Sequence, residues 1–361
     1  MQRRLALGIP LLACVAYLLW WPVPIDPAAW NPPSDRGLTG SFAPNDRLSG
    51  FERVSIGDNH GPEAVAVGAD GRLYVATLNH IVRLEADGSK PTNWVRTGGR
   101  PLGMAFDAHG NLIVADGFRG LLSVSPTGVV TELATVADGM PILYADDVDI
   151  ASDGKIYFSD ASTKFPARGT GTFNASLLEI VEHGGHGRLL VYDPATRQAT
   201  TLVKGLIFAN GVAMAHDHRS VLVNETGSYR VLRVWLDETR RGKVEPFIEN
   251  LPGFPDNITR GGDGRYWVAL YAPRAKVLDV LARYPYLRKM MMRLPAAIRP
   301  KAKPFGHVVA LDDSGRVVAD LQEPSGAYPT TTSVRETAQH LYVGSLTAPV
   351  LARVPKSIAG L

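Results

Sequence analysis

The chain repeats one hairpin pattern six times between residues 63 and 345, and this repetition limits the folds that it can adopt. In each repeat an apolar strand is followed by a tight polar turn and a second strand with aromatic or β-branched residues. This order is typical of a β-hairpin. The third repeat shows it clearly, with Asp147–Ile150, the turn Asp153–Gly154 and Ile156–Ser159. The six first strands begin near Glu63, Leu102, Asp147, Asn210, Asp256 and Thr331.

The spacing of these hairpins, roughly 40 to 75 residues, predicts radial repetition of four-stranded sheets. We therefore expect an all-β, six-bladed β-propeller over residues 50–361. The segment Phe51–Ile56 would supply the outer strand that closes the last blade on the first. A β-sandwich is the alternative, but sandwiches do not usually repeat one hairpin six times.

The N-terminal segment Leu5–Val23 contains no charged residue and follows Arg3 and Arg4. Its length nearly crosses a bilayer, and the basic flank favours the cytoplasmic side. We predict a signal anchor over residues 1–23, a single pass with the N-terminus cytoplasmic and the propeller on the periplasmic or lumenal side. A cleaved signal peptide is the alternative, although no small-residue cleavage site follows the apolar run. Residues 24–49 are rich in Pro, Asn, Asp and Ser and predict a linker.

The overall charge gives no sign of a nucleic-acid partner. The chain has 38 Lys and Arg against 35 Asp and Glu, a net charge of +3, and no basic stripe interleaved with aromatic residues. Cys14 is the sole cysteine, so no intrachain disulfide can stabilise the fold.

Oxygen-bearing side chains recur where the innermost strands begin. In an antiparallel blade whose strands run outward, these positions ring the mouth of the central channel. Ca²⁺ prefers six to eight oxygen ligands, and the lack of His or Cys at these positions argues against zinc. For Asp256 and Asn257 alone, a Pro-Asp-Asn turn is the alternative. The predicted calcium ligands are Glu63, Asp146, Asn210, Asp256 and Asn257.

Several motifs resemble the strictosidine synthase-like proteins, and within them the adipocyte plasma membrane-associated protein-like members. These motifs are Gly99–Gly103, Asp153–Asp160, Phe208–Val212 and Leu251–Asn257. The resemblance runs from about residue 50 to the end and includes the N-terminal anchor. It implies membership of the wider group of calcium-dependent six-bladed hydrolases that includes gluconolactonases and paraoxonases. It also implies that Glu63, Asn210, Asp256 and Asn257 match the calcium ligands of that group.

Three departures limit what the resemblance implies. Asp146 stands where the group usually has Asn, which adds a charge. Leu102 stands where paraoxonases place a catalytic His, so their mechanism does not transfer. Strictosidine synthases rely on a glutamate late in the chain; Glu336 lies in that stretch, but its surroundings match poorly.

The sequence thus favours a membrane-anchored, calcium-dependent hydrolase of hydrophobic esters or lactones. Calcium would polarise the carbonyl group, and Asp256 would be the general base that takes a proton from water. Two alternatives stay open: a strictosidine synthase-type enzyme that joins an amine to an aldehyde, and a propeller that binds a ligand without catalysis.

Two long segments are expected to cover the mouth of the channel. Residues 161–187 contain a short helix that Asn174 would cap, followed by His183 and His186 in a Gly-rich turn. These histidines are expected to be solvated, with metal binding as the alternative. Residues 272–304 have the pattern of amphipathic helices with basic residues. They predict a helical insertion over the top face, either a lid packed on the propeller or one that also contacts lipid or a hydrophobic substrate.

Overall fold

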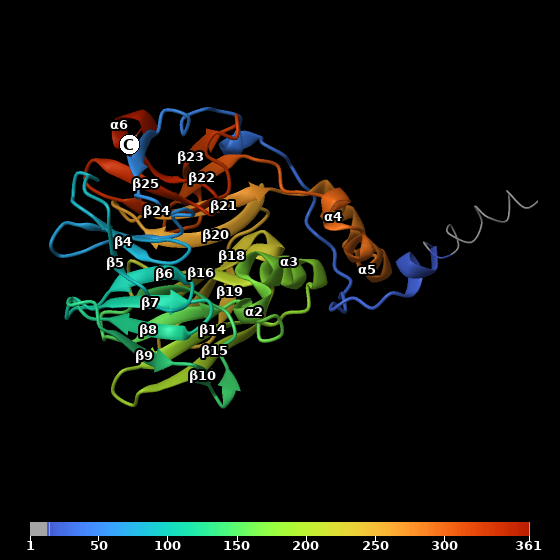
Figure 1. The fold of residues 1–361 in the computed structure, drawn as a ribbon, viewed down its shortest axis with the longest axis horizontal. Coiled ribbons are helices and arrows are strands. Elements are labelled where there is room, and N and C mark those ends of the chain that lie inside the picture. Colours follow the sequence, from blue (N-terminus) through green and yellow to red (C-terminus); the bar gives the residue numbers. More distant parts are fainter. Residues whose placement is uncertain (1–12, 14, 361) are drawn as a thin grey trace, which may run out of the picture.

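The structure is a computed structural model that describes residue 13 and residues 15–360 of the 361-residue chain. Its body consists of six antiparallel sheets of four strands (Figure 1). The first three are β2 (Val65–Val67), β3 (Leu73–Ala76), β4 (Ile81–Leu84), β5 (Thr92–Val95); β6 (Pro101–Phe106), β7 (Leu112–Asp116), β8 (Gly120–Val124), β9 (Val130–Ala134); and β12 (Ala145–Ile150), β13 (Ile156–Asp160), β14 (Gly187–Asp193), β15 (Gln198–Leu206). The others are β16 (Ala209–Met214), β17 (Ser220–Glu225), β18 (Arg230–Trp235), β19 (Val244–Ile248); β20 (Gly253–Arg260), β21 (Tyr266–Pro273), β22 (Gly306–Leu311), β23 (Val317–Glu323); and β24 (Thr331–Glu336), β25 (His340–Ser345), β26 (Val350–Pro355), β1 (Glu52–Ser55).

The six sheets form a closed ring. The innermost strands contact one another in the order β2, β6, β12, β16, β20, β24 and back to β2. The fold is therefore the predicted six-bladed β-propeller.

The last blade combines both ends of the propeller sequence. β1 pairs with β26 in an antiparallel register that sets Val54 opposite Leu351, so the predicted role of this segment as the closing strand is confirmed. Such closure hydrogen-bonds the first and last strands of the propeller within one sheet, and it removes an edge that would otherwise be open.

Apolar side chains fill the spaces between neighbouring blades. Trp267 is fully buried in blade 5 and packs in one cluster with Val308 of the same blade and Val334 and Val343 of blade 6. Successive side chains of a strand point to opposite faces of its sheet. Each strand can therefore pack against both neighbouring blades, because each blade lies between two others.

Five of the six inner strands carry a register irregularity close to their first residue. The irregularities lie between Pro101 and Met104, Ala145 and Val148, Ala209 and Val212, Pro255 and Ile258, and Thr331 and Val334. A β-bulge bends the strand and changes where its side chains point. Four of the five predicted ligands fall inside three of these bulges, namely Asp146, Asn210, Asp256 and Asn257.

Two helical insertions lie together on one side of the propeller, and we call them the cap (Figure 1). Between β13 and β14 are α2 (Ala167–Thr170) and α3 (Thr172–Glu182), and between β21 and β22 are α4 (Lys276–Leu281), α5 (Pro285–Arg293) and η3 (Ala296–Ile298). The predicted helical insertions are therefore present. α3 starts at Thr172, three residues earlier than a helix capped by Asn174 would, so Asn174 lies inside it and donates instead to the Thr170 carbonyl oxygen. The short remaining elements are η1 (Gly40–Phe42), β10 (Val136–Ala137), β11 (Met140–Pro141), η2 (Thr226–Ser228) and α6 (Lys356–Ala359).

Most of the predicted membrane anchor, residues 1–12 and 14, lies outside the described residues. In the part of the chain that is described, no helix is both long and apolar enough to span a bilayer. Residues 24–49 follow the surface of the domain: the Ala28 amide donates to the Glu182 carbonyl oxygen of α3. Further on, the Asn45 side chain donates to Asp320 of blade 5 over 2.7 Å. The predicted linker thus lies against the cap and the propeller.

Candidate functional site

Four of the predicted site residues meet at the mouth of the channel. The negative charges of Glu63 and Asp146 both act on Asp256, and the side chain of Asn210 contacts Asp256 as well. Glu63 precedes β2, and the other three lie in the bulges of β12, β16 and β20. All four are at least nine-tenths buried.

Asn257 lies next to Asp256 in the same bulge but lines the channel below the mouth, together with Asp147 and Arg260. Within the described residues, no three His, Cys, Asp or Glu side chains form a group compact enough to hold a metal. The carboxylates therefore interact through space without forming a closed ligand set. Their assignment as calcium ligands stays a prediction.

Burial of the carboxylates dominates the electrostatics of the mouth. It raises the pKa of Asp146 and of Asp256 well above the ordinary value, and the nearby charge of Glu63 raises both further. Burial also raises the pKa of Glu63, which the guanidinium of Arg100 partly offsets. Buried carboxylates without enough positive partners pay a desolvation cost, so this site favours an added cation.

Arg100 is a site residue that the sequence reasoning missed. Its Nη2 lies 2.7 Å from Oε2 of Glu63, and both side chains are almost fully buried. The Arg100 amide donates to Oδ1 of Asp116 over 2.9 Å, which fixes the start of this strand. When Glu63, Asp146 and Asp256 are all ionised they contribute −3, and Arg100 contributes +1, so the net charge is −2, which one Ca²⁺ would neutralise. The one signal in the sequence was its place in the Gly99–Gly103 motif.

Two tyrosines also border the mouth and were not predicted. Burial, with the charges of Asp146, Glu63 and Asp256, raises the pKa of Tyr144 well above its usual value. Burial raises the pKa of Tyr271 to about 12, and Asp256 and Glu63 contribute. Both phenols are therefore neutral at physiological pH, and the Tyr144 hydroxyl donates to the Thr172 carbonyl oxygen of α3 over 3.2 Å.

The donor chemistry fits a hard cation. The side-chain oxygens Oδ1 of Asn210 and of Asn257 are buried and have no hydrogen-bond partner among the described residues. Unpaired buried oxygens are rare in proteins because each costs desolvation energy. Oxygens of this kind, together with carboxylates, are the ligands that calcium prefers.

Below the mouth, the charges of the channel are already paired. Asp149 and Arg260 form an ion pair of 3.2 Å, and Asp147 accepts the amides of Val148 and Val212, each over 2.9 Å. Burial raises the pKa of Asp147 to about 7. The Nε of Arg335 donates to the Val65 carbonyl oxygen over 3.0 Å. These contacts leave a cavity of about 50 Å³ in this part of the channel.

An apolar cluster covers the mouth from the cap side. Leu102, Tyr144 and Phe208 of the propeller pack in one cluster with Met291 of α5 and with Ile25 of the N-terminal segment. A substrate would have to pass this cover to reach Asp256.

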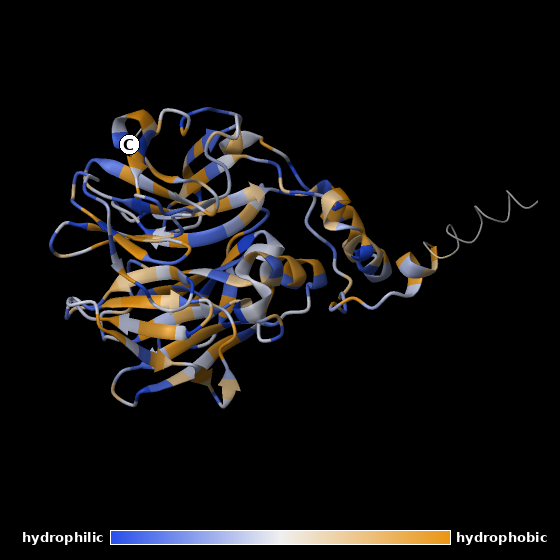
Figure 2. Cartoon of the chain, viewed as in Figure 1, coloured by the Kyte–Doolittle hydropathy of each residue, from blue (hydrophilic) through white to orange (hydrophobic). Residues whose placement is uncertain are grey.

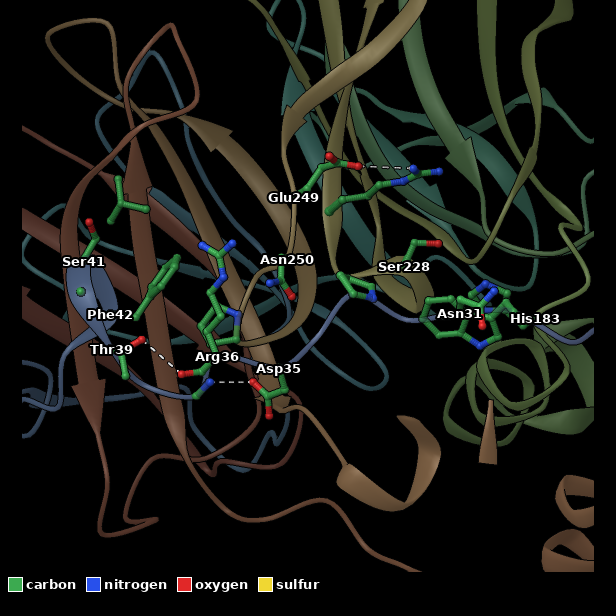
Figure 3. A pocket seen from close by; sticks show the side chains of 17 residues that line it. Asn31, Asp35, Arg36, Thr39, Ser41, Phe42, His183, Ser228, Glu249 and Asn250 are labelled. Carbon is green, nitrogen blue, oxygen red and sulfur yellow. Dashed lines mark hydrogen bonds and ion pairs between the residues drawn. The ribbon is translucent and has the colours of Figure 1, made fainter. Parts of the chain in front are cut away.

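A larger cavity of about 840 Å³ lies elsewhere, between residues 30–42 and the edges of blades 4 and 5 (Figure 3). Arg36 and Asn250 face it, and the pair Arg230–Glu249 stands at one end. None of the predicted site residues lines this cavity, so its size alone does not make it the reaction site.

Glu336 lies far from the mouth. It is the last residue of β24, whose first residue, Thr331, lies at the mouth end, so Glu336 is at the opposite face. Its carboxylate accepts the Trp267 indole N–H over 2.7 Å and pairs with Lys356 over 2.5 Å. These contacts stabilise the packing of blades 5 and 6 and give it no access to the channel mouth.

The two cap histidines are less solvated than the sequence predicts. His183 stacks on Trp30 with ring centroids 3.9 Å apart, and burial lowers its pKa to about 3. His186 lies 2.7 Å from the buried carboxylate of Glu182. Both rings therefore help to fasten the cap.

The fold and the oxygen-lined mouth place the chain among the six-bladed propellers that carry a polar site at one end of the channel. The family model described as strictosidine synthase matches residues 146–239, and the model for the N-terminal part of strictosidine synthase-like proteins matches residues 40–84. The chain belongs to the strictosidine synthase-like family.

Its relatives match over most of their length. Protein strictosidine synthase-like 4 of Arabidopsis thaliana is 36% identical over 86% of this chain and 83% of its own. The adipocyte plasma membrane-associated protein of Salmo salar is 34% identical over 97% of this chain and 88% of its own.

Solved structures support the fold. A gluconolactonase from Xanthomonas campestris superposes with a TM-score of 0.61 at 17% identity, covering 86% of this chain and 90% of that one. Regucalcin from Agrobacterium tumefaciens, a calcium-binding protein, superposes with a TM-score of 0.59 at 16% identity, covering 84% and 93%. At these identities the likeness is one of fold.

Proposed function

We propose that the protein is a calcium-dependent hydrolase of hydrophobic esters or lactones. The observation that carries this proposal is the buried set of Glu63, Asp146, Asn210 and Asp256 at the channel mouth, with a net charge of −2 once Arg100 is included. Two further observations support it, the unpaired oxygens of Asn210 and Asn257 and the likeness in fold to a gluconolactonase and to calcium-binding regucalcin.

Each of these residues would have its own role in the proposed reaction. Glu63, Asp146, Asn210, Asp256 and Asn257 would hold the calcium ion, which when bound supplies a Lewis acid for the carbonyl oxygen. Asp256 would accept the proton of the attacking water as general base. Tyr271 would present a neutral hydroxyl group beside the reacting carbonyl, where hydrogen-bond donors stabilise developing negative charge, and Tyr144, whose hydroxyl donates to Thr172 of α3, would hold the cap over the mouth. The apolar cover would exclude bulk water and select hydrophobic substrates.

We also propose that the chain is anchored in a membrane by its N-terminal segment, with the propeller outside the cytoplasm. The apolar run after Arg3 and Arg4 supports this, and so does the name of the adipocyte plasma membrane-associated relatives. A membrane location would suit a hydrophobic substrate.

The test is hydrolysis of a panel of aryl esters and lactones by the purified full-length protein, with calcium and after chelation. We expect turnover that is lost on chelation and restored by calcium but not by magnesium. Calcium binding without hydrolysis of any substrate in the panel would favour a ligand-binding propeller instead. Absence of calcium binding by calorimetry would refute the proposal.

A second candidate is the condensation of an amine with an aldehyde, which the match to the strictosidine synthase model favours. Glu336 cannot serve that reaction at the mouth, because it lies on the opposite face. Condensation by the chelated protein, monitored as loss of aldehyde in the presence of an aryl amine, would support this candidate over hydrolysis.

A further inference from the structure

Large apolar side chains are exposed mainly in two segments of the described chain. Ten of the eighteen such side chains that are exposed lie within residues 15–21 or 277–298. Trp20 is 72% exposed and Ile298 is 66% exposed. The rest, which include Phe173 of α3, are spread over the described chain, as is normal for a protein surface. The concentrated ones are Val15, Tyr17, Trp20, Trp21, Val277, Val280, Tyr284, Tyr286, Leu287 and Ile298.

These two segments form one continuous surface. Arg293 of α5 donates to the carbonyl oxygens of Trp21 over 2.6 Å and of Leu18 over 2.9 Å. The Tyr286 hydroxyl donates to the Leu19 carbonyl oxygen over 2.6 Å. An α-helix leaves its last carbonyl oxygens unpaired, and a cationic side chain there is favourable. α5 therefore holds the end of the N-terminal helix, of which residues 13 and 15–20 are described, and Figures 1 and 2 show both apolar segments on the side of the cap that faces away from the propeller.

A buried arginine of α5 holds the helices of the cap together on the side that faces the propeller. Arg288, only 2% exposed, donates to the carbonyl oxygens of Val181 at the end of α3 over 2.7 Å and of Ala282 after α4 over 3.1 Å. It also donates to the carbonyl oxygen of Ala28. One side chain thus joins α3, α4, α5 and the N-terminal segment, so the exposed side is displayed by a rigid unit.

The segment that contains α4, α5 and η3 is strongly basic. Residues 274–305 contain nine Lys or Arg and one acidic residue, Asp279. The Asp279 carboxylate forms an ion pair with Arg274 over 2.9 Å and accepts a hydrogen bond from the Tyr229 hydroxyl over 2.9 Å. Four of the basic side chains are exposed and have no carboxylate partner among the described residues, namely Lys276, Arg283, Lys301 and Lys303.

We propose that this outward side of α4, α5 and η3, which we call the cap surface, lies in the head-group region of an anionic bilayer. Exposed aliphatic and aromatic side chains with surrounding Lys and Arg are the composition of interfacial helices, whose apolar side sinks about 5–10 Å into the interface. α5 also contacts residues 18–21, which belong to the predicted anchor. A second copy of this chain fits less well, because two basic surfaces would repel each other.

The contact would orient the whole molecule. The cap covers the mouth of the channel, so a bilayer against the cap surface would set the mouth toward the lipid, and a lipophilic ester could enter without crossing water. This inference rests on the anchor of the proposed function but not on hydrolysis.

The experiment uses the full-length protein in vesicles of phosphatidylcholine with phosphatidylglycerol, in a Cys14→Ser background. Single cysteines replace Val280 on the cap surface, Tyr17 in the N-terminal helix, or Val129, and each carries a bimane label. Val129 is 62% exposed in the turn between β8 and β9, which the strand order puts on the face away from the mouth. Lipids brominated near the head group quench a label that lies in the interface.

We expect loss of fluorescence at positions 280 and 17 and none at 129. Quenching at 17 but not at 280 would overturn the inference and leave the anchor intact. No quenching at either position would remove the anchor as well. Cross-linking of the 280 label to a second protein molecule, without quenching, would show that the surface joins copies of the chain.

A charge variant tests the basic component separately. Lys276→Gln, Arg283→Gln, Lys301→Gln and Lys303→Gln combined should reduce quenching at position 280 and abolish its dependence on phosphatidylglycerol, while quenching at 17 stays unchanged. All four side chains are exposed, so the fold should tolerate the change. Unaltered quenching at 280 would contradict the predicted role of anionic lipid.

Discussion

At the scale of single residues, Glu63, Asp146 and Asp256 share one buried environment, and the guanidinium of Arg100 is the cation that acts on Glu63 and Asp146. Each carboxylate raises the cost of ionising the others, since like charges in a low dielectric repel strongly. The bulges bring this about, because they turn two successive residues of an inner strand toward the channel. Two predictions follow from this balance of charge.

Asp256→Asn keeps an oxygen at the position and nearly the same shape but removes the proposed base. We expect turnover to fall by about two or more orders of magnitude, the usual scale of general-base contributions. Calcium affinity, measured by calorimetry, should fall less, whereas Asn210→Ala should weaken calcium binding and activity together. Full turnover of Asp256→Asn at saturating calcium would make Asp256 a ligand only. Glu225, an acidic residue at the end of β17, is already paired with Arg230 over 2.5 Å and so is not a free base.

Arg100→Met removes the positive charge that competes with calcium for Glu63. In chelator the variant should be destabilised by about 3–5 kcal/mol, the usual cost of breaking a buried ion pair. Calcium should bind more tightly than to the unmodified protein and should restore much of the loss. Urea unfolding with and without calcium measures both effects. Arg188→Met, which breaks the buried pair with Asp160, is the control, because calcium should not rescue it. Equal losses in both conditions for Arg100→Met would show that Arg100 is remote from the ion.

At the scale of elements, the cap is held by the apolar cluster over the mouth and by polar contacts at helix ends. The turn that ends α3 makes two of these contacts. His183 follows the helix in a left-handed conformation with φ 57°, and its amide donates to the Glu179 carbonyl oxygen. Its ring then stacks on Trp30 of the N-terminal segment. The cap thus depends on a neutral imidazole, because burial and the charges of Arg288 and Arg230 lower the pKa of His183.

This environment makes the stability of the cap depend on pH. The pKa of His183 is about 3 in the folded chain and about 6.5 when unfolded, so between these values the unfolded chain binds more protons. The stabilisation is therefore complete above about pH 6.5 and declines as the pH falls toward 3. Asn suits the left-handed conformation, so in His183→Asn we expect a smaller loss of stability between pH 7 and 5. Unfolding by urea at both pH values measures it, and an unchanged pH dependence would contradict the prediction.

At the scale of the whole molecule, closure of the ring forces inner strands of different blades to face each other across the channel. The mouth therefore brings together residues that are far apart in sequence. The repulsion between their charges lowers the stability of the whole propeller. An ion that binds only the folded state stabilises it by mass action.

Calcium should therefore raise the stability of the full propeller. At a free concentration about 100 times the Kd, the gain is about 2.7 kcal/mol, which calorimetric melting would show as a higher Tm. Magnesium should give a smaller shift, because it retains water and demands a tighter geometry. A melting temperature that is equal in calcium and in chelator would argue against an ion at the mouth.

The sequence by itself determined the number of blades and the closing strand. Both depend on local patterns, the period of two in the strands and the polar turns between them, which the chain repeats often enough to be read without tertiary information. It also indicated where oxygen-bearing residues gather, because every inner strand begins at the same end of the channel. The membrane anchor is a prediction of the same kind and lies mostly outside the described residues.

The tertiary structure alone decided which groups act on those residues. The pair of Arg100 with Glu63 joins positions in different blades, and Tyr144 and Tyr271 reach the carboxylates from two further blades. The apolar cover of the mouth joins α3, α5 and Ile25, and Glu336 falls on the opposite face. These contacts depend on the rotation between blades and on how the cap packs across them. No local pattern specifies either, because each contact joins segments that only the closed ring brings together.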